Sequence, residues 1–252
     1  MENMKETIDR LIDIGAQLEK PEQIEICGKT YCTKQLKRYD GPEYATPLTG
    51  STLTGLLDYA ELIMPHERGE DDHPAYFIQI ESETQVRIMS MLDKEARRET
   101  LYQAMAITSD FDFGRWYRQD EFVIALQANF LPSDDLAAVK TVSGNVKAET
   151  VATYGDDGTQ QRATIRQGVA TAVDIEVPNP VELTPYRTFA EVKQPSSSFV
   201  FRIQANEQKD SRPEFKLVAA DGDHWKLDAI ESIRAYLSTE CSRRGILTYI
   251  IG

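Results

Sequence analysis

Residues 76–91 read YFIQIESETQVRIMSM, and this stretch decides which fold class the sequence predicts. Tyr76 to Ile80 and Gln85 to Met91 are both β-like runs, and a short acidic turn joins them. Leu101 to Ile107 is a candidate third strand farther along the chain. We therefore expect an antiparallel meander in this part of the protein.

Helical patterns flank the meander. Residues 4–18 predict an N-terminal helix, because apolar side chains recur at helical spacing: Met4, Ile8, Leu11, Ile12 and Leu18. A second helix is expected after Ser51 or Thr52, either of which can cap it, and its apolar stripe consists of Leu53, Leu56, Leu57, Ala60 and Ile63. In the centre of the chain, Asp120 is expected to cap one helix and Ser133 to begin another.

The last helix is expected to begin after Asp223 as its cap and to end at Gly245. Its apolar side chains fall on one side and predict packing against a sheet: Leu227, Ile230, Ile233, Leu237 and Cys241. The terminal run Ile246 to Ile251 then predicts one more strand.

The remaining strands are expected in hairpins. Ile24 and Ile26, with a turn at Gly28-Lys29, predict a small one near the N-terminus. Residues 155–158 (GDDG) predict a turn between strands at 151–154 and 159–165. Val173 to Val177 alternates as a strand does, and Phe199 to Ile203 with Phe215 to Ala219 predicts a further hairpin.

Together these patterns predict an α+β fold with an antiparallel sheet-dominated core and N-terminal, central and C-terminal helices. We expect residues 1–252 to form a single domain. A subdivision is possible, with a mixed α/β part at 1–145 and a β-rich part with the C-terminal helix at 146–252.

The charge of the chain limits its partners. Lys and Arg total 28 against 41 Asp and Glu, giving a formal net charge of −13. An acidic protein without a basic stripe repels phosphate backbones, so generic binding to nucleic acids or to an anionic membrane is not expected. No targeting segment or membrane-length apolar run is visible, and three sparse cysteines suit a reducing compartment. These features favour a cytoplasmic protein.

Residues 66–73 contain the best candidate for a metal site. Carboxylates and imidazoles can bind divalent ions, and the weak candidate ligands are His66, Glu70, Asp71, Asp72 and His73. Ligands must converge in space, however, and these residues share one loop between Pro65 and Pro74. A solvent-facing acidic loop is the favoured interpretation, and no metal or other cofactor is expected.

Catalytic signatures are absent from the sequence. It contains no Gly-x-Ser-x-Gly elbow, Walker loop or Gly-x-Gly-x-x-Gly motif. Acids at Asp110, Asp112, Asp120 and Glu121 surround several aromatic residues, a combination that glycoside hydrolases use. The simpler interpretation is that the aromatic residues, Trp116 included, pack in the core. No catalytic residue is predicted.

Several stretches resemble a family of uncharacterised proteins from tailed phages and prophages, broadly YfdQ-like. The resemblance spans roughly residues 50 to 250, and the stretches that carry it include 113–130 (FGRWYRQDEFVIALQANF), 143–146 (SGNV) and 184–189 (TPYRTF). It implies a phage or prophage origin and a location in the bacterial host cytoplasm. It implies no activity and no catalytic residues.

We therefore expect a phage accessory protein that acts non-enzymatically, through self-assembly and binding of a host or phage component. Two alternatives remain: a metal-dependent hydrolase using the His66–His73 loop, and an acidic nucleic-acid mimic that inhibits a host defence. The proline-rich run from Pro178 to Pro195 supplies the candidate residues for a homo-oligomer interface, in a closed ring or shell: Val181, Leu183, Tyr186, Phe189 and Val192. The other possibility is that this run wraps its own domain.

Overall fold

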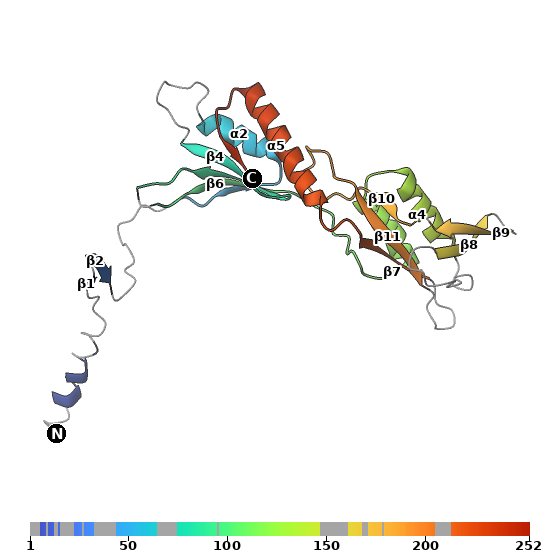
Figure 1. The fold of residues 1–252 in the computed structure, drawn as a ribbon, viewed down its shortest axis with the longest axis horizontal. Helices are drawn as coiled ribbons and strands as arrows, with labels where there is room; N and C mark the ends of the chain where they lie inside the picture. The colour runs from blue at the N-terminus through green and yellow to red at the C-terminus, as the bar shows by residue number, and fades with distance from the viewer. Residues whose placement is uncertain are drawn as a thin grey trace. The chain divides into compact units, whose positions relative to one another are not determined.

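A computed structural model gives the fold of the chain (Figure 1). It describes residues 6–8, 10–12, 15, 23–26, 28–32, 44–64, 75–94, 96–146, 161–167, 171–177, 179–204 and 213–252, with backbone alone in 161–167 and 171–177. The chain divides into two units, Met1–Tyr44 and Ala45–Gly252.

The first unit contains helical residues at 6–8 and 10–12 and one hairpin. Strand β1 (Gln23–Ile26) pairs antiparallel with β2 (Lys29–Cys32). Gly28 has a φ of 73° at the turn, a conformation that glycine adopts without the steric cost of a Cβ atom. The small N-terminal hairpin expected from the sequence is therefore confirmed.

The second unit contains a five-stranded mixed sheet in the order β13-β4-β5-β6-β3. Strands β4 (Tyr76–Ser82), β5 (Gln85–Ser90) and β6 (Thr100–Met105) form the expected antiparallel meander. Parallel strands flank it, because β13 (Ile250–Ile251) pairs with β4 and β3 (Leu48–Gly50) pairs with β6. The expected terminal strand is confirmed, whereas the pairing of β3 was not predicted.

Helices α2 (Leu53–Ile63) and α5 (Trp225–Arg244) cover one face of this sheet (Figure 1). Thr52 caps α2, because its hydroxyl accepts a hydrogen bond from the Gly55 N–H at 3.1 Å. Gly245 ends α5 with a left-handed φ of 71°. Buried side chains from the helices and the sheet form one core, here called the α2–α5 core; it includes Leu56, Leu57, Ile78, Ile88, Ile233 and Leu237.

The second unit also contains a separate four-stranded antiparallel sheet, in the order β10-β11-β12-β7. Its strands are β10 (Val181–Leu183), β11 (Ser197–Gln204), β12 (Glu214–Ala219) and β7 (Tyr117–Arg118). Helices α3 (Gln119–Asn129) and α4 (Asp134–Asn145) pack on one face. The shared core, here called the aromatic core, includes Phe111, Phe122, Phe130, Phe199, Phe201 and Phe215.

Stacking of phenylalanine rings organises the aromatic core. The Phe122 ring from α3 is nearly parallel to the Phe201 ring of β11, with centroids 5.9 Å apart, and lies 5.4 Å from the Phe215 ring of β12. Phe199, Phe201 and Ile203 point inward because alternate residues of a strand face the same side. The hairpin of β11 and β12 expected from the sequence is confirmed.

Strand β8 (Gln161–Gln167) pairs antiparallel with β9 (Thr171–Val177). The predicted strand at 151–154 and the predicted turn at 155–158 lie outside the described residues. The boundary considered near residue 145 does not separate the cores, since both contain residues from before and after that position.

Three details of the helix predictions are wrong. The N-cap position of α3 is Arg118, and Asp120 lies within the first turn. The N-cap position of α5 is His224; Asp223 precedes it with a φ of 65° and bonds to Lys226 instead of capping. Leu227 is 66% exposed and does not belong to the buried stripe, which Ile233, Leu237 and Cys241 form.

Replacing Ile233 by alanine should reduce the free energy of unfolding by about 2–4 kcal/mol, because the side chain is fully buried against the five-stranded sheet. Leu227→Ala on the same helix is the matched control and should change it by less than about 0.5 kcal/mol. Urea denaturation of both variants measures the difference. Equal effects would contradict the described orientation of α5.

Candidate binding surfaces

The metal candidates His66, Glu70, Asp71, Asp72 and His73 all lie outside the described residues. Within the described residues, no group of three or more His, Cys, Asp or Glu side chains is arranged to hold a metal ion. The proposed ligands in residues 66–73 therefore stay a prediction from the sequence.

Two free cysteines are described, and they differ in environment. Cys32 is exposed, whereas Cys241 is buried in the α2–α5 core. Burial raises the pKa of the Cys241 thiol to about 11. The thiolate, which is the nucleophilic form, is therefore scarce at neutral pH, so Cys241 is suited to packing and not to nucleophilic catalysis.

The aromatic residues near the acids Asp110 and Asp112 are mainly core residues. Phe111 and Tyr117 are buried, and their rings stack with centroids 5.0 Å apart. The Tyr117 hydroxyl accepts a hydrogen bond from the backbone N–H of Asp112 at 2.7 Å. Trp116 is the exception, because it lies on the opposite face of the sheet.

The oligomer-interface candidates lie mostly inside the chain's own cores. Val181 and Leu183 of β10 are buried in the aromatic core, and Phe189 and Val192 are buried in the α2–α5 core. Tyr186 is the exposed member of the set. The proline-rich run wraps its own unit at these positions, which was the alternative interpretation of its apolar residues.

A buried amide fixes the middle of this run. The Gln194 Oε1 atom accepts hydrogen bonds from the backbone N–H groups of Arg187 at 2.8 Å and Thr188 at 3.1 Å. Its Nε2 atom donates to the carbonyl oxygens of Phe189 at 2.9 Å and Thr188 at 3.3 Å. One side chain thus satisfies four backbone groups of a loop that has no regular secondary structure.

Arg187, which belongs to the same loop, is a buried cation. Its guanidinium carbon lies 4.0 Å from the centroid of the Trp225 ring, and Nη2 donates to Ser197 Oγ and to the Pro195 carbonyl. Burial lowers the pKa of Arg187 to about 10, while the carboxylates of Asp221 and Asp223 act in the opposite direction. The group therefore remains charged at neutral pH, held by cation–π contact and hydrogen bonds.

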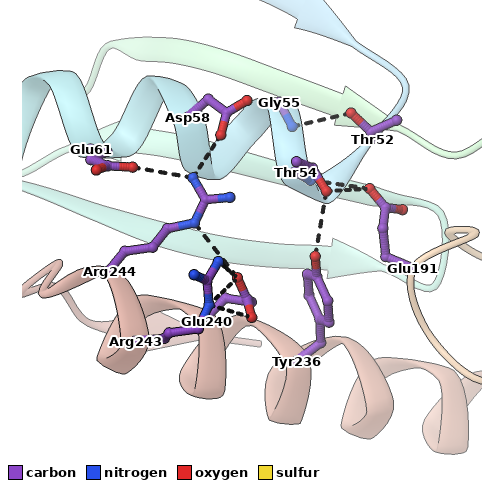
Figure 2. A network of polar contacts seen from close by, with 10 residues as sticks. All are labelled: Thr52, Thr54, Gly55, Asp58, Glu61, Glu191, Tyr236, Glu240, Arg243 and Arg244. Atoms are coloured by element: carbon purple, nitrogen blue, oxygen red, sulfur yellow. Dashed lines mark hydrogen bonds and ion pairs between the residues drawn. The ribbon is translucent and has the colours of Figure 1, made fainter.

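A polar network joins α2 to α5 (Figure 2). Arg244 Nη1 of α5 contacts Asp58 Oδ1 at 2.6 Å and Glu61 Oε2 at 3.2 Å on α2. Both carboxylates raise the pKa of Arg244, and the hydrogen bond to Asp58 makes the largest contribution. Arg243 binds Glu240 at 2.6 Å, and its hydrogen bond lowers the pKa of that carboxyl.

The network continues at the start of α2. Glu191 Oε1 accepts from the Thr54 N–H at 3.1 Å and lies 3.2 Å from the Thr54 hydroxyl, which in turn lies 3.4 Å from the Tyr236 hydroxyl (Figure 2). A carboxylate at a helix N-terminus accepts a hydrogen bond from an otherwise unpaired N–H, and its negative charge interacts favourably with the helix dipole. These contacts explain how the two helices and the 187–194 loop are held together, and we assign the network a structural role.

Among the described residues, the first unit has several exposed apolar side chains. Every side chain described between residues 6 and 32 is exposed. Ile8, Leu11 and Ile12, at 51%, 63% and 62% exposed, share one helical face because residues three and four apart are neighbours on a helix. Ile24 and Ile26 are likewise exposed and share one face of β1.

The outer face of the four-stranded sheet carries a groove of about 520 Å³. It is lined by residues from β11 and β12 and by the residue before β7: Trp116, Val200, Arg202, Ile203, Gln204, Lys216 and Val218. Arg202 and Lys216 lie directly opposite each other in the strand register, and so do Val200 and Val218. The Lys216 Nζ atom lies 4.4 Å from the centroid of the Trp116 ring.

The comparisons with known proteins identify no relative. Neither family models nor curated proteins nor solved structures give a match. The resemblance to phage and prophage proteins therefore stays an expectation from the sequence. None of the described helices is long and apolar enough to cross a membrane.

Sequence reasoning missed the outer-face groove. Strand alternation contained a usable signal, because Val200, Arg202 and Gln204 alternate with buried Phe199, Phe201 and Ile203. What the sequence lacked was the register that places Lys216 opposite Arg202. The expectation that Trp116 packs in the core was wrong for the same reason.

Gln194→Ala should reduce the free energy of unfolding by about 2–4 kcal/mol, since buried backbone groups of the 187–189 segment would lose their partners. Lys193→Ala, one residue away and exposed, should change it by less than about 0.5 kcal/mol. Thermal and urea unfolding of the two variants provide the measurement. A stable Gln194→Ala variant would show that the loop holds its conformation without the amide.

Cys241 should react with a water-soluble disulfide reagent far more slowly than Cys32 in the folded protein. Burial raises the pKa of Cys241 to about 11, so its thiolate fraction is small at neutral pH, and burial also shields its sulfur from the reagent, whereas Cys32 is exposed. The reaction is best followed in a Cys27→Ser background, with and without denaturant. Equal rates in the folded state would contradict the burial of Cys241.

Proposed function

We propose that this chain is a non-enzymatic accessory protein that assembles with copies of itself through residues 1–44. The unit 45–252 would then carry the surface that binds a host or phage component. The observation that supports assembly is the exposure of Ile8, Leu11, Ile12, Ile24 and Ile26 in a unit whose described side chains are all exposed between residues 6 and 32.

A segment of this size needs a partner to be stable. Chains of about 40 residues bury too little surface to fold alone without disulfides, metals or association. An isolated two-stranded hairpin is likewise marginal in water. The exposed apolar faces of the first unit are therefore expected to be covered by another surface in the working protein.

The sequence of the helix favours a second copy as that surface. Met4, Ile8, Leu11 and Leu18 follow one another at intervals of four, three and seven residues. This is the spacing of the a and d positions of a coiled coil, in which helices of the same sequence pack against each other. A closed arrangement is expected, because open contacts between identical copies form fibres.

The resemblance to phage and prophage proteins supports the biological setting of this proposal. It implies expression in the bacterial host cytoplasm, where the chain would meet both phage and host components. The resemblance names no activity. Assembly and binding are the functions that the exposed surfaces favour.

Light scattering of the full chain provides the test of assembly. The wild type should have a mass that is a multiple of 28.5 kDa, and the double variant Ile8→Asp/Leu11→Asp should be monomeric. The reason is that a buried, unpaired carboxylate in an apolar helix interface is strongly unfavourable.

Leu62→Asp is the matched control. Leu62 is 82% exposed on α2 in the other unit, so the same change of chemistry there should leave the assembly intact. A monomeric wild type throughout the micromolar range would refute the proposal. An assembly that survives Ile8→Asp/Leu11→Asp but not Leu62→Asp would place the interface on the second unit.

A further inference from the structure

We propose that the outer edge of strand β13, with the groove between it and α5, is a docking site for an extended, acid-containing peptide segment of a partner protein. The segment would add a strand to the five-stranded sheet next to Ile250 and place a carboxylate against Arg234. This inference rests on the proposed function, in which the second unit binds a partner, and it names the surface that does so. The site lies entirely within the second unit.

The backbone of β13 is paired on one side. Strand β13 is the end strand of its sheet, and β4 is the described strand with which it pairs. The Ile78 N–H donates to the Tyr249 carbonyl at 2.9 Å, so Tyr249 and Ile251 direct their backbone groups toward β4. Backbone groups of successive residues in a strand point to opposite sides, and the N–H and C=O of Ile250 therefore point away from β4. An added strand supplies the hydrogen-bond partners that such edge groups need.

The edge lacks several features that keep natural sheet edges from pairing. Charged side chains, prolines and bulges at an edge oppose the addition of another strand. Although β13 is short, residues 248–251 read TYII, with neither a charge nor a proline, and Tyr249 and Ile251 are exposed. At the opposite edge of the same sheet, Pro47 directly precedes β3. The β13 edge is therefore the less protected of the two.

The groove lies between α5 and this edge and has a volume of about 440 Å³. Arg234, Ser238 and Ser242 line its helical wall, and residues 246–250 line the other wall. The three side chains form one row along α5, because residues four apart are neighbours on a helix. A strand that pairs with Ile250 would present every second side chain to this row. Backbone hydrogen bonds would thus supply affinity, and the row would supply the preference for particular side chains.

Arg234 sets the preferred chemistry of the docked segment. It is half-buried, and in the described part of the chain its side chain forms no ion pair, hydrogen bond or cation–π contact. Arg243 and Arg244, on the same helix, are both paired with carboxylates. An Asp or Glu of the docked segment would give Arg234 a charge-assisted hydrogen bond of the same kind.

The lining of the groove favours a partner peptide over a second copy of the same edge. The residues that line it include no Asp or Glu. Two copies that paired edge to edge through β13 would therefore leave both Arg234 side chains without a carboxylate from the opposite groove. A separate segment that carries an acid satisfies the backbone edge and the cation together.

Peptides selected from a random library on the full-length protein provide the first test. They should contain an Asp or Glu, and their affinity should fall by about tenfold or more in the variant Arg234→Glu. Lys193→Glu is the matched control, since it makes the same change of charge at an exposed loop position of the same unit and should leave the affinity unchanged. Fluorescence anisotropy of synthetic copies of the peptides measures the binding.

The backbone contact is tested at Ile250 itself. Ile250→Pro removes the N–H that faces the groove and none that pairs with β4, so peptide affinity should fall by about tenfold or more. Ile250→Ala shortens the side chain but keeps the N–H, and it should bind as the wild type does. If the proline variant does not fold by circular dichroism, peptides N-methylated at alternate positions replace it, and methylation of one of the two sets should abolish binding.

Peptide binding is also measured with Ile8→Asp/Leu11→Asp, which separates this inference from assembly. Affinity should be unchanged in that variant, whereas light scattering alone decides whether residues 1–44 assemble. Failure to select any peptide, selection of peptides without acids, or equal binding by the wild type, Arg234→Glu and Ile250→Pro would overturn the docking proposal. So would a dimer that persists in Ile8→Asp/Leu11→Asp and is lost on adding Ile250→Pro, because a second copy would then occupy the edge.

Discussion

The second unit depends on the hydrogen bonds of one buried side chain, the amide of Gln194. The loop that it fixes runs between two separate cores, because Leu183 enters the aromatic core and Phe189 enters the α2–α5 core a few residues later. The Thr188 hydroxyl bonds to the Glu83 carbonyl at 2.6 Å, and the Ser109 N–H donates to the Tyr186 carbonyl at 2.7 Å. These contacts join the loop to the turn after β4 and to the segment after β6. Two cores built from interleaved parts of the chain therefore meet along a short, irregular segment whose backbone bonds both to side chains and to backbone groups of neighbouring segments.

Local sequence signals predicted the elements that depend on local physics. The alternation in residues 76–91 gave the meander, and capping chemistry gave the start of α2 at Thr52 and the end of α5 at Gly245. A capping prediction failed where a neighbouring side chain takes the carboxylate that would otherwise cap the helix. Asp223 has the chemistry of a helix cap, but its backbone takes a positive φ and its carboxylate bonds to Lys226.

Apolar residues in an irregular segment were the hardest to place from sequence. Val181, Leu183, Phe189 and Val192 have no regular period, so their pattern does not indicate whether a partner subunit or the chain itself covers them. The parallel pairing of β3 with β6 was equally inaccessible, because nothing in residues 48–50 specifies a partner more than fifty residues away. The outer-face groove depends on cross-strand register, which places Arg202 opposite Lys216 only once the hairpin is formed.

The nesting of the two cores has a consequence for how the chain is made. The aromatic core spans Phe111 to Leu217, whereas the α2–α5 core begins at Leu53 and requires Ile233, Leu237 and Ile246. During synthesis, residues emerge from the ribosome in order and units fold as they become complete. The aromatic core can close before α5 has emerged from the ribosome, but the meander must wait with an apolar face uncovered until that helix emerges. Strand β13 emerges after α5 and then pairs with β4, a strand made some 170 residues earlier.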